Sequence, residues 1–480
     1  MSINDFLAIL PVLVVLVTGV LVMVADVFLP EGRKGIAALL SGLGLAAGLG
    51  AALAAVPSTG TAFAGMVVAD GFSLFLDALF AAVGLVGIGL AYDYFKRMRL
   101  QRGEYYTLLL FSIGGMMLMG HANDLVMFFL ALELLSIPLY ILSGFFRARL
   151  ASQEAALKYF LLGAFSSGFV LYGIAMVFGG TASINLEGIV AAVRDGSANL
   201  TFLLVGAALL VVGFAFKVSA VPFHAWTPDV YEGAPSPLTG FMSSATKAAG
   251  FAALIRLLLV VFPALGENLA PVVSGLAALT MIAGNLIALV QTNIKRLLAY
   301  SSIAHAGYLL IGLVAVNSSA AGDAVAAMLF YLVGYAIANL GAWSVVVAAE
   351  QAEGRGLELE DYSGLGRKYP WLGVAMLVFM LSFIGVPLTL GFWGKLYLFR
   401  VALESGLFGL AVIGIAASLV SAYYYLRVVV YMFFRDGEGV ARRDVWLNLI
   451  AIGSAAAVVL MALVPGDLLQ VAAQAVLRVP

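Results

Sequence analysis

Residues 371–401 read WLGVAMLVFMLSFIGVPLTLGFWGKLYLFRV and form an apolar stretch with few charges. A bilayer core is crossed by about 20 helical residues, so this stretch is longer than one straight crossing needs. Pro387 has no amide hydrogen and interrupts a helix. Backbone that is not helical survives at membrane depth only where protein covers it or where it lines a cavity. We therefore predict a membrane-embedded helix that is broken at Gly385-Val386-Pro387, with Lys395 after the break.

A second apolar stretch, near 200–221, leads into the same kind of break at Val221-Pro222. Lys217 lies shortly before this proline. Its ammonium group could reach the aqueous boundary if the helix stops before the proline. It lies deep in the membrane only if the element continues past the proline toward Tyr231. The sequence leaves these two alternatives open.

The composition places most of this chain in lipid. Of its 480 residues, 63% are hydrophobic and 11% are charged, whereas a soluble chain carries roughly a quarter charged residues. A soluble domain has no interior large enough to hide so much apolar surface. We therefore expect an all-α polytopic protein of the lipid bilayer.

The charge and the residue inventory exclude several functions. The net charge of −1 provides no basic field for binding nucleic acid. The absence of cysteine excludes disulfides, thiolate-ligated iron–sulfur clusters and zinc sites that need cysteine. A haem held by two histidines would need two of His121, His224 and His305, and no sequence pattern favours that. Any redox cofactor is therefore expected on another chain.

Charge clusters and turn residues divide the sequence into fourteen candidate spans. They lie near 5–29, 35–56, 72–94, 104–120, 123–145, 153–180, 200–221, 237–262, 271–291, 297–316, 323–349, 371–401, 405–434 and 444–464. We interpret the first as a retained span rather than as a cleaved signal peptide. Lysine and arginine gather in the loops after odd-numbered spans, and Arg194, Arg400 and Arg478 are the exceptions on the other side. Because cytoplasmic loops are enriched in basic residues, both termini are predicted on the periplasmic side.

The chain carries signs of an internal duplication. The segment YFLLG at 159–163 resembles FYLVG at 330–334, and the two Val-Pro pairs are offset by a similar distance along the chain. Spans 4–8 and 9–13 would then form two five-helix repeats, and the odd number of spans inverts the second repeat. The predicted segments are a three-helix segment over 1–103, a first repeat over 104–262, a second repeat over 263–440, and a C-terminal helix and tail over 441–480.

Four of the ionisable residues inside predicted spans carry the argument: Glu133, Lys217, Lys247 and Lys395. A charge at the centre of a span raises the insertion free energy by about 2.5–3.5 kcal/mol. Glu133 and Lys247 have apolar-rich sequence on both sides and cannot reach the headgroups. Lys395 could reach outward if its span ends early, and Arg256, nearer a span end, is expected to do so. Removal from water favours neutral lysine, so several buried lysines near a carboxylate form a candidate proton relay.

Three further polar residues have two interpretations each. Lys158 follows Glu154 by four residues, which is the spacing of an ordinary ion pair on a helix surface. His305 lies on a polar stripe within residues 301–308, either as a structural histidine or as a proton carrier, because the ordinary histidine pKa is about 6.5. His224 lies in a turn-rich stretch expected near the cytoplasmic surface, where it could gate proton uptake or simply hold the loop.

Three segments carry a family resemblance: FKVSAVPFHAWTPDVYEGAP at 216–235, NIKRLLAYSSIAHAGY at 293–308 and LGFWGK at 390–395. They resemble the subunit N family of NADH–quinone oxidoreductase (respiratory complex I), one of its antiporter-like membrane subunit families. The first segment is similar in Mrp-type sodium/proton antiporter subunits as well, whereas the third favours subunit N. The likeness extends over nearly the whole chain.

The resemblance implies a proton relay through the membrane. Glu133 and Lys217 would be its coupled pair and Lys247 its central lysine. His305 would be a bridging group and Lys395 the lysine on the exit side. The full set that the resemblance implies is Glu133, Lys158, Lys217, Lys247, His305 and Lys395, with helix breaks at Pro222 and Pro387 and a possible gate at His224.

The same resemblance implies where this chain would work. It would carry no cofactor, and NADH, FMN, iron–sulfur clusters and quinone would lie on partner subunits. Its partners would be the neighbouring antiporter-like and small membrane subunits of complex I in the bacterial inner membrane, and indirectly the peripheral redox arm. Protons would move from cytoplasm to periplasm, coupled to quinone reduction elsewhere in the complex. Two alternatives are a subunit of an Mrp-type antiporter complex and an inert membrane scaffold.

Overall fold

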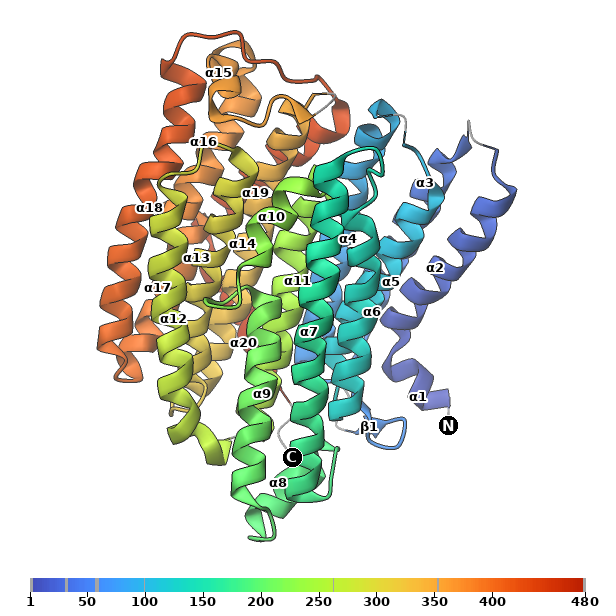
Figure 1. Ribbon diagram of the computed structural model, residues 1–480, viewed down its shortest axis with the longest axis vertical. Helices are drawn as coiled ribbons and strands as arrows, with labels where there is room; N and C mark the ends of the chain where they lie inside the picture. The colour runs from blue at the N-terminus through green and yellow to red at the C-terminus, as the bar shows by residue number, and fades with distance from the viewer. Residues whose placement is uncertain are drawn as a thin grey trace.

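The computed structural model describes residues 3–30, 33–56, 60–98, 100–261, 263–351 and 354–477. The fold is a bundle of long helices that run roughly side by side (Figure 1). Its first half contains α1 Ile3–Ala8, α2 Leu10–Phe28, α3 Gly35–Ala54, β1 Thr61–Ala62, β2 Val67–Val68, α4 Gly71–Arg97, α5 Gly103–His121, α6 Leu125–Ser143, α7 Leu150–Thr181, α8 Leu186–Arg194, α9 Leu200–Val218, α10 Trp226–Gly233 and α11 Ser236–Arg256.

The second half begins with a π-helical turn and a 3-10 turn and continues as helices. Its elements are Leu257–Val261, Pro263–Leu265, α12 Gly266–Ala288, α13 Ile294–Ala315, α14 Ala321–Ala349, the 3-10 turn Leu359–Tyr362, α15 Leu365–Lys368, α16 Pro370–Ile384, α17 Leu390–Glu404, α18 Phe408–Phe434, α19 Val445–Leu463 and α20 Pro465–Gln474. In the part of the chain that the structure describes, the two short strands pair antiparallel as one hairpin.

The predicted all-α membrane fold is confirmed. Among the described residues, 12 helices are long and apolar enough to cross a membrane. The other two predicted spans fall on α5 and on the pair α16 and α17. The count of fourteen and the periplasmic position of the termini stay predictions, and Arg478 lies outside the described residues. The short helices α8 and α20 were not predicted.

Three helices form the centre of the bundle. We compared the share of buried residues in the most apolar 18-residue stretch of each helix. This share is 94% in α11, 94% in α13 and 89% in α14, whereas it is 28% in α19 at the periphery. A helix that is buried on all sides can carry polar groups only where neighbouring helices supply partners. Lys247 lies on α11 and His305 on α13, so two predicted site residues occupy the centre of the molecule.

Both predicted helix breaks are present. The first separates α9 from α10, and the second separates α16 from α17. Each upstream half ends in a residue with left-handed backbone, Ser219 at φ 64° and Gly385 at φ 90°. In Figure 1 the chain runs up through α9 and α10 and down through α16 and α17. The two broken helices are therefore antiparallel, as inverted repeats require; the repeat boundaries themselves stay predictions.

Candidate functional site

Four lysines are buried in the described part of the chain without a carboxylate within 4.0 Å of their ammonium nitrogens: Lys217, Lys247, Lys295 and Lys395. Their exposed fractions are 2–4%. A buried ammonium group ordinarily needs a paired charge or a full set of hydrogen bonds. Here every hydrogen-bond partner of the four is a hydroxyl or a backbone carbonyl. None of these acceptors holds the proton on the lysine as a carboxylate would.

Lys217 lies in the last turn of α9, immediately before the break. Its Nζ donates to Ser136 Oγ at 2.8 Å and to Tyr159 OH at 3.2 Å. The Tyr159 ring stacks on Trp226, the first residue of α10, with ring centroids 4.5 Å apart. The Trp226 indole in turn donates to Phe216 O at 3.0 Å, which ties the two halves of the broken helix together. Because the element continues as α10, Lys217 lies inside the protein rather than at a helix end that meets water.

Glu133 lies on α6, three residues before Ser136 and hence on nearly the same face. It is half-buried, and it accepts a hydrogen bond from Ser167 on α7. It forms no direct ion pair with Lys217 among the described residues. Lys217 instead contacts Ser136, which lies on the same helix as Glu133, and Glu133 lies within electrostatic range of Lys217. The geometry therefore brings Glu133 and Lys217 close together without joining them.

Lys247 and His305 belong to one polar cluster between α11, α13 and α18. Lys247 Nζ donates to the backbone carbonyl of Ser302 on α13. His305 lies three residues further along α13, and its Nε2 is hydrogen-bonded with Tyr425 OH at 3.2 Å. Its Nδ1 is hydrogen-bonded with Tyr331 OH at 2.6 Å. Both ring nitrogens of His305 therefore face hydroxyl groups that can accept or donate a proton.

Lys395 lies on α17, directly after the second break, and points inward. Its Nζ donates to Phe383 O at 2.8 Å, Ile384 O at 3.0 Å and Ser418 Oγ at 2.7 Å. The two carbonyls belong to the last turn of α16, where helical carbonyls have no partner within the helix and carry the negative end of the helix dipole. The ammonium nitrogen also lies 4.6 Å from the centroid of the Tyr308 ring. The Lys395 side chain therefore points into the protein and does not reach outward to the headgroups, which was the alternative that the sequence left open.

Two features connect these positions across the bundle. Gly250, one turn after Lys247 on α11, packs so closely on α9 that a Cβ there would lie 3.6 Å from two stem carbons of Lys217. Beside His305, a small cavity of about 10 Å³ is lined by residues that include Tyr331, Tyr335 and Ser382. A cavity of this size has room for about one water molecule. Lys217 therefore lies beside the turn of α11 that follows Lys247, and His305 lies within electrostatic range of both Lys247 and Lys395.

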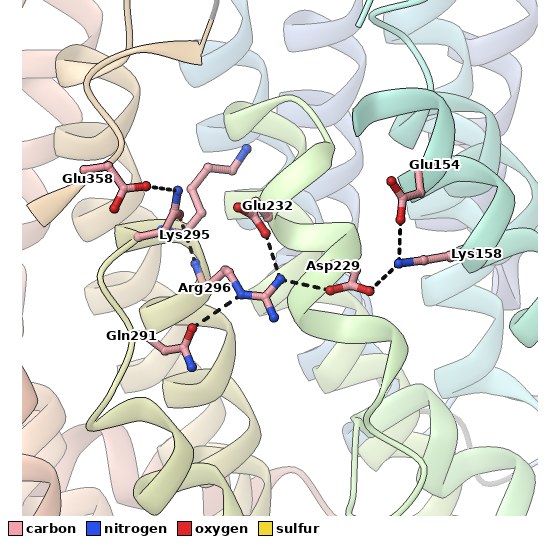
Figure 2. A network of polar contacts seen from close by, with 9 residues as sticks. Glu154, Lys158, Asp229, Glu232, Gln291, Lys295, Arg296 and Glu358 are labelled. Atoms are coloured by element: carbon pink, nitrogen blue, oxygen red, sulfur yellow. Dashed lines mark hydrogen bonds and ion pairs between the residues drawn. The ribbon is translucent and has the colours of Figure 1, made fainter. Parts of the chain in front are cut away.

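Two predicted residues lie apart from these positions. Lys158 is 39% exposed and forms the predicted ion pair with Glu154 at 2.6 Å. It also pairs with Asp229 on α10 at 2.6 Å, and Arg296 joins Asp229 from α13 (Figure 2). His224 lies in the segment between α9 and α10. Figure 1 shows this break part-way along the bundle and not at its end, where the sequence suggested a surface loop.

Two basic residues differ from their sequence predictions. Arg256 does not reach toward headgroups: it is 1% exposed and binds both carboxylate oxygens of Asp70, at 2.9 and 3.0 Å. Lys295 lies between the predicted spans 271–291 and 297–316, in a loop that the basic-residue pattern places on the cytoplasmic side. Its ammonium group is nevertheless buried and donates to Ala234 O at 2.7 Å. Figure 2 shows its side chain turned away from the ion network that its neighbour Arg296 joins. The seven-residue spacing from Lys295 to Ser302 was the signal that could have revealed it, since it places both on one face of α13.

Comparison with known proteins identifies the family. A family model described as "NADH:quinone oxidoreductase/Mrp antiporter, TM" matches residues 122–421. NADH-quinone oxidoreductase subunit N of Trichlorobacter lovleyi is 46% identical over 98% of this chain and 96% of its own length. This chain belongs to the subunit N family of NADH–quinone oxidoreductase. It is accordingly a multi-pass protein of the bacterial inner membrane.

Solved structures agree with membership of the subunit N family. A chain in "Respiratory complex I from Thermus thermophilus with bound Aureothin" is 36% identical, with a TM-score of 0.83 over 96% of this chain and 99% of that one. A chain of the Mrp complex from Dietzia sp. has a TM-score of 0.86 over 99% of this chain and 97% of its own, but it is 22% identical. That second likeness shows a common fold alone. All the predicted relay residues lie within the range that the family model matches.

Proposed function

We propose that this chain translocates protons as an antiporter-like membrane subunit of NADH–quinone oxidoreductase. The observation that carries the proposal is the row of buried lysines whose acceptors are hydroxyls and carbonyls. A carboxylate partner would fix the proton on each ammonium group, whereas neutral acceptors leave an amine free to exist in both protonation states. Membership of the subunit N family supports the same assignment.

The proposed path uses the chain's own side chains in order. A proton reaches Lys217 or Lys247 from the cytoplasmic side. It passes from Lys247 Nζ to the hydroxyl cluster at His305. The His305 ring can accept this proton at one nitrogen and release a proton from the other. It then reaches Lys395 Nζ and leaves toward the periplasm. Water in the cavity beside His305 would bridge the longer gaps.

Coupling is proposed to act on the first half of the relay. A change in charge near Glu133 would alter the electrostatic field at Lys217, because the two groups lie within electrostatic range of each other. The chain would sit beside other membrane subunits of complex I, and quinone reduction elsewhere in the complex would supply the energy. NADH, FMN, iron–sulfur clusters and quinone would be held by partner subunits. Lys158 remains a proposed relay lysine, although its ion pairs place it at the surface.

Substitution of Tyr425 tests the path with a matched control. Tyr425→Phe removes the hydroxyl that contacts Ser301 and His305 and keeps the ring. The two lost hydrogen bonds are worth about 1 kcal/mol each, so the NADH-driven acidification of inverted vesicles should slow by up to roughly thirtyfold. Tyr105→Phe removes an equally buried hydroxyl on α5 that has no hydrogen-bond partner in the described part of the chain, and it should leave the rate unchanged.

Lys217→Ala extends this test to the first half. Normal assembly with impaired acidification supports the relay. Normal acidification by Lys217→Ala and Tyr425→Phe in an assembled complex would overturn it. An inert scaffold makes a different prediction: it expects such substitutions to reduce the amount of complex and to leave pumping per complex unchanged.

A further inference from the structure

A cavity of about 610 Å³ lies between α3, α4, α14, α19 and α20, and the proposed relay uses none of its lining residues. Its wall on α4 runs from Gly71 to Val86, about 22 Å along the helix axis. This length is more than half of the roughly 30 Å that a bilayer core measures. Because α3, α4, α14 and α19 are long and apolar enough to cross a membrane, the cavity lies at membrane depth.

This cavity is where the central helix α14 is open to its surroundings. Between Ala324 and Ala349, Val333 and Ile337 are the two residues of α14 that are not buried, and both line the cavity. They lie four residues apart and therefore share one face of the helix. A molecule that contacts these two side chains has to enter the cavity, because the protein covers the remainder of this stretch.

The wall on α4 is a stripe of apolar and small residues. Its members recur every three or four residues, line the cavity and are at least partly exposed: Gly71, Phe75, Ala78, Ala82 and Val86. The lining of the whole cavity contains two polar side chains, Ser454 and Gln474. An apolar cavity does not hold ordered water, and an empty one destabilises a protein in proportion to its volume. We therefore expect an apolar chain to fill it.

A second cavity, of about 550 Å³, continues the first toward one end of the bundle. Ala55 and Leu74 belong to the linings of both cavities. The second cavity also has polar residues in its lining, among them Asn4, Asp5 and Thr61. They come from α1 and β1, which lie at the end of the bundle where both ends of the chain are found (Figure 1). An apolar cavity that opens into a polar one at the end of the helices fits an amphipathic molecule such as a membrane lipid.

The charge of the second cavity selects among lipid headgroups. Asp5 is the one charged residue that lines either cavity in the described part of the chain, and no described lysine or arginine lines them. The Asp5 Oδ1 atom accepts a hydrogen bond from Phe63 N at 3.2 Å, which holds the carboxylate beside β1. A carboxylate attracts an ammonium group and repels a phosphate that has no positive charge of its own nearby. The cavity therefore favours a headgroup that carries an amine.

We propose that the two cavities together bind one phospholipid with a primary-amine headgroup, of the phosphatidylethanolamine class. One acyl chain lies along the α4 stripe and contacts Val333 and Ile337 on α14. The headgroup occupies the second cavity, where its ammonium group faces the Asp5 carboxylate. The sequence-predicted orientation places this lipid in the periplasmic leaflet. The bound acyl chain covers the one face of α14 that the protein leaves open between residues 324 and 349.

Photo-crosslinking in the assembled complex tests the acyl-chain site. The probe is a phosphatidylethanolamine with a diazirine on one acyl chain, in vesicles that contain the complex, and mass spectrometry should find adducts at Val333 and Ile337. Ala82→Phe fills the cavity and should lower these adducts several-fold. Ala456→Phe, at an exposed position of α19 outside the cavity lining, should leave them unchanged. Absence of adducts on α14 in the unmodified complex, or equal adducts in Ala82→Phe, would overturn the site.

A phosphatidylglycerol with the same diazirine chain tests the headgroup assignment. In the unmodified complex, the phosphatidylethanolamine probe should label α14 several-fold more than the phosphatidylglycerol probe. Asp5→Asn should bring the two probes toward equal labelling, whereas Asp467→Asn, at an exposed position of α20 outside both cavity linings, should keep the difference. Equal labelling of the unmodified complex, or a preference for phosphatidylglycerol, would contradict the proposal. Neither measurement depends on proton transfer, so the result is independent of the proposed function.

Discussion

Buried cations in this chain are accommodated in two different ways. Arg256 is paired with Asp70 through two hydrogen bonds and also donates to Gly120 O at 2.8 Å. The planar guanidinium fork matches the carboxylate, and an arginine does not give up its proton in proteins. The buried lysines have neutral acceptors instead. We infer that Arg256 has a structural role and that the lysines are the groups whose charge can change.

The Arg256 pair yields a stability prediction. Arg256→Leu leaves the Asp70 carboxylate buried without its guanidinium partner, which should destabilise the protein by about 3–5 kcal/mol. The measurement is thermal unfolding of the purified complex, or the amount of assembled complex. Arg400→Leu is the control, because the Arg400–Glu404 pair is exposed and such pairs contribute about 0–1 kcal/mol. Equal stability of the two variants would contradict the structural role of Arg256.

At the residue scale, the sequence predicted the central groups better than those near helix ends. Glu133 and Lys247 have apolar sequence on both sides, so no side-chain conformation could carry their charge to water. Lys295 and Arg256 lie near helix ends, where a long side chain can turn either way. The direction in which each side chain points depends on its partner, Ala234 for Lys295 and Asp70 for Arg256. Both partners are far away in the sequence, so the sequence pattern alone does not show that they lie nearby.

At the scale of elements, the breaks place helix ends inside the bundle. The end of α16 directs free carbonyls at Lys395, and Lys217 lies in the last turn of α9. The negative end of a helix stabilises a nearby cation by about 0.3–1 kcal/mol, and up to about 2 kcal/mol when it is partly buried. The breaks thus supply electrostatic stabilisation for a lysine without a carboxylate. An unbroken helix at the same depth would offer no free carbonyls.

The second break should be sensitive to added volume. A Cβ at Gly391, the second residue of α17, would lie 1.8 Å from the carbonyl oxygen of Ser382 in the last turn of α16. Gly391→Ala should therefore force the half-helices apart, destabilise the protein by about 1–3 kcal/mol and weaken the hydrogen bonds of Lys395. Gly409→Ala on α18 meets nothing within 4 Å and should be neutral. Thermal unfolding and acidification rates measure both effects; identical behaviour of the two variants would show that the break is not tightly packed.

The breaks were predictable from sequence, whereas the short helices were not. Pro222 and Pro387 lie in long apolar stretches, where each removes a helical hydrogen bond. A proline does not always end a helix, since Pro138 lies inside the continuous helix α6. The helices α8 and α20 are 9 and 10 residues long and lie outside the long apolar runs. Helices this short depend on tertiary packing rather than on their own sequence. The packing of α20 against α14 could not be anticipated from residues 465–474 alone.

At the scale of the whole molecule, the residues of the proposed relay are distributed over helices from both halves of the chain. The proposed relay starts near Glu133 on α6, passes Lys217 and Lys247, and ends at Lys395 on α17. It crosses from one predicted repeat to the other, and His305 lies on the side of the second. A bundle with inverted repeats places both broken helices at a similar depth, so their lysines can lie on one line. The predicted duplication would therefore place Lys217 and Lys395, the lysines of the two broken helices, at a similar depth in the bundle.

The orientation of the bundle gives a prediction of its own. Arg194 on α8 and Arg435 after α18 are both exposed, and Arg435 O accepts a hydrogen bond from Arg367 on α15 at 2.8 Å. Figure 1 places α8 and α15 at opposite ends of the bundle. Arg435→Cys should therefore react with an impermeant thiol reagent from the cytoplasmic side only, and Arg194→Cys from the periplasmic side only. The reverse pattern would invert the predicted topology and the direction assigned to the proposed relay.

The most direct test of the relay is the number of protons translocated per NADH oxidised by complexes that carry Lys247→Ala. The measurement compares proton uptake with NADH oxidation in inverted vesicles, normalised to the amount of assembled complex, with the exposed Lys368→Ala as control. A buried lysine that carries protons predicts a ratio clearly below that of the unmodified complex, with the control unchanged. An unchanged ratio in fully assembled Lys247→Ala complexes would show that protons do not pass through this residue.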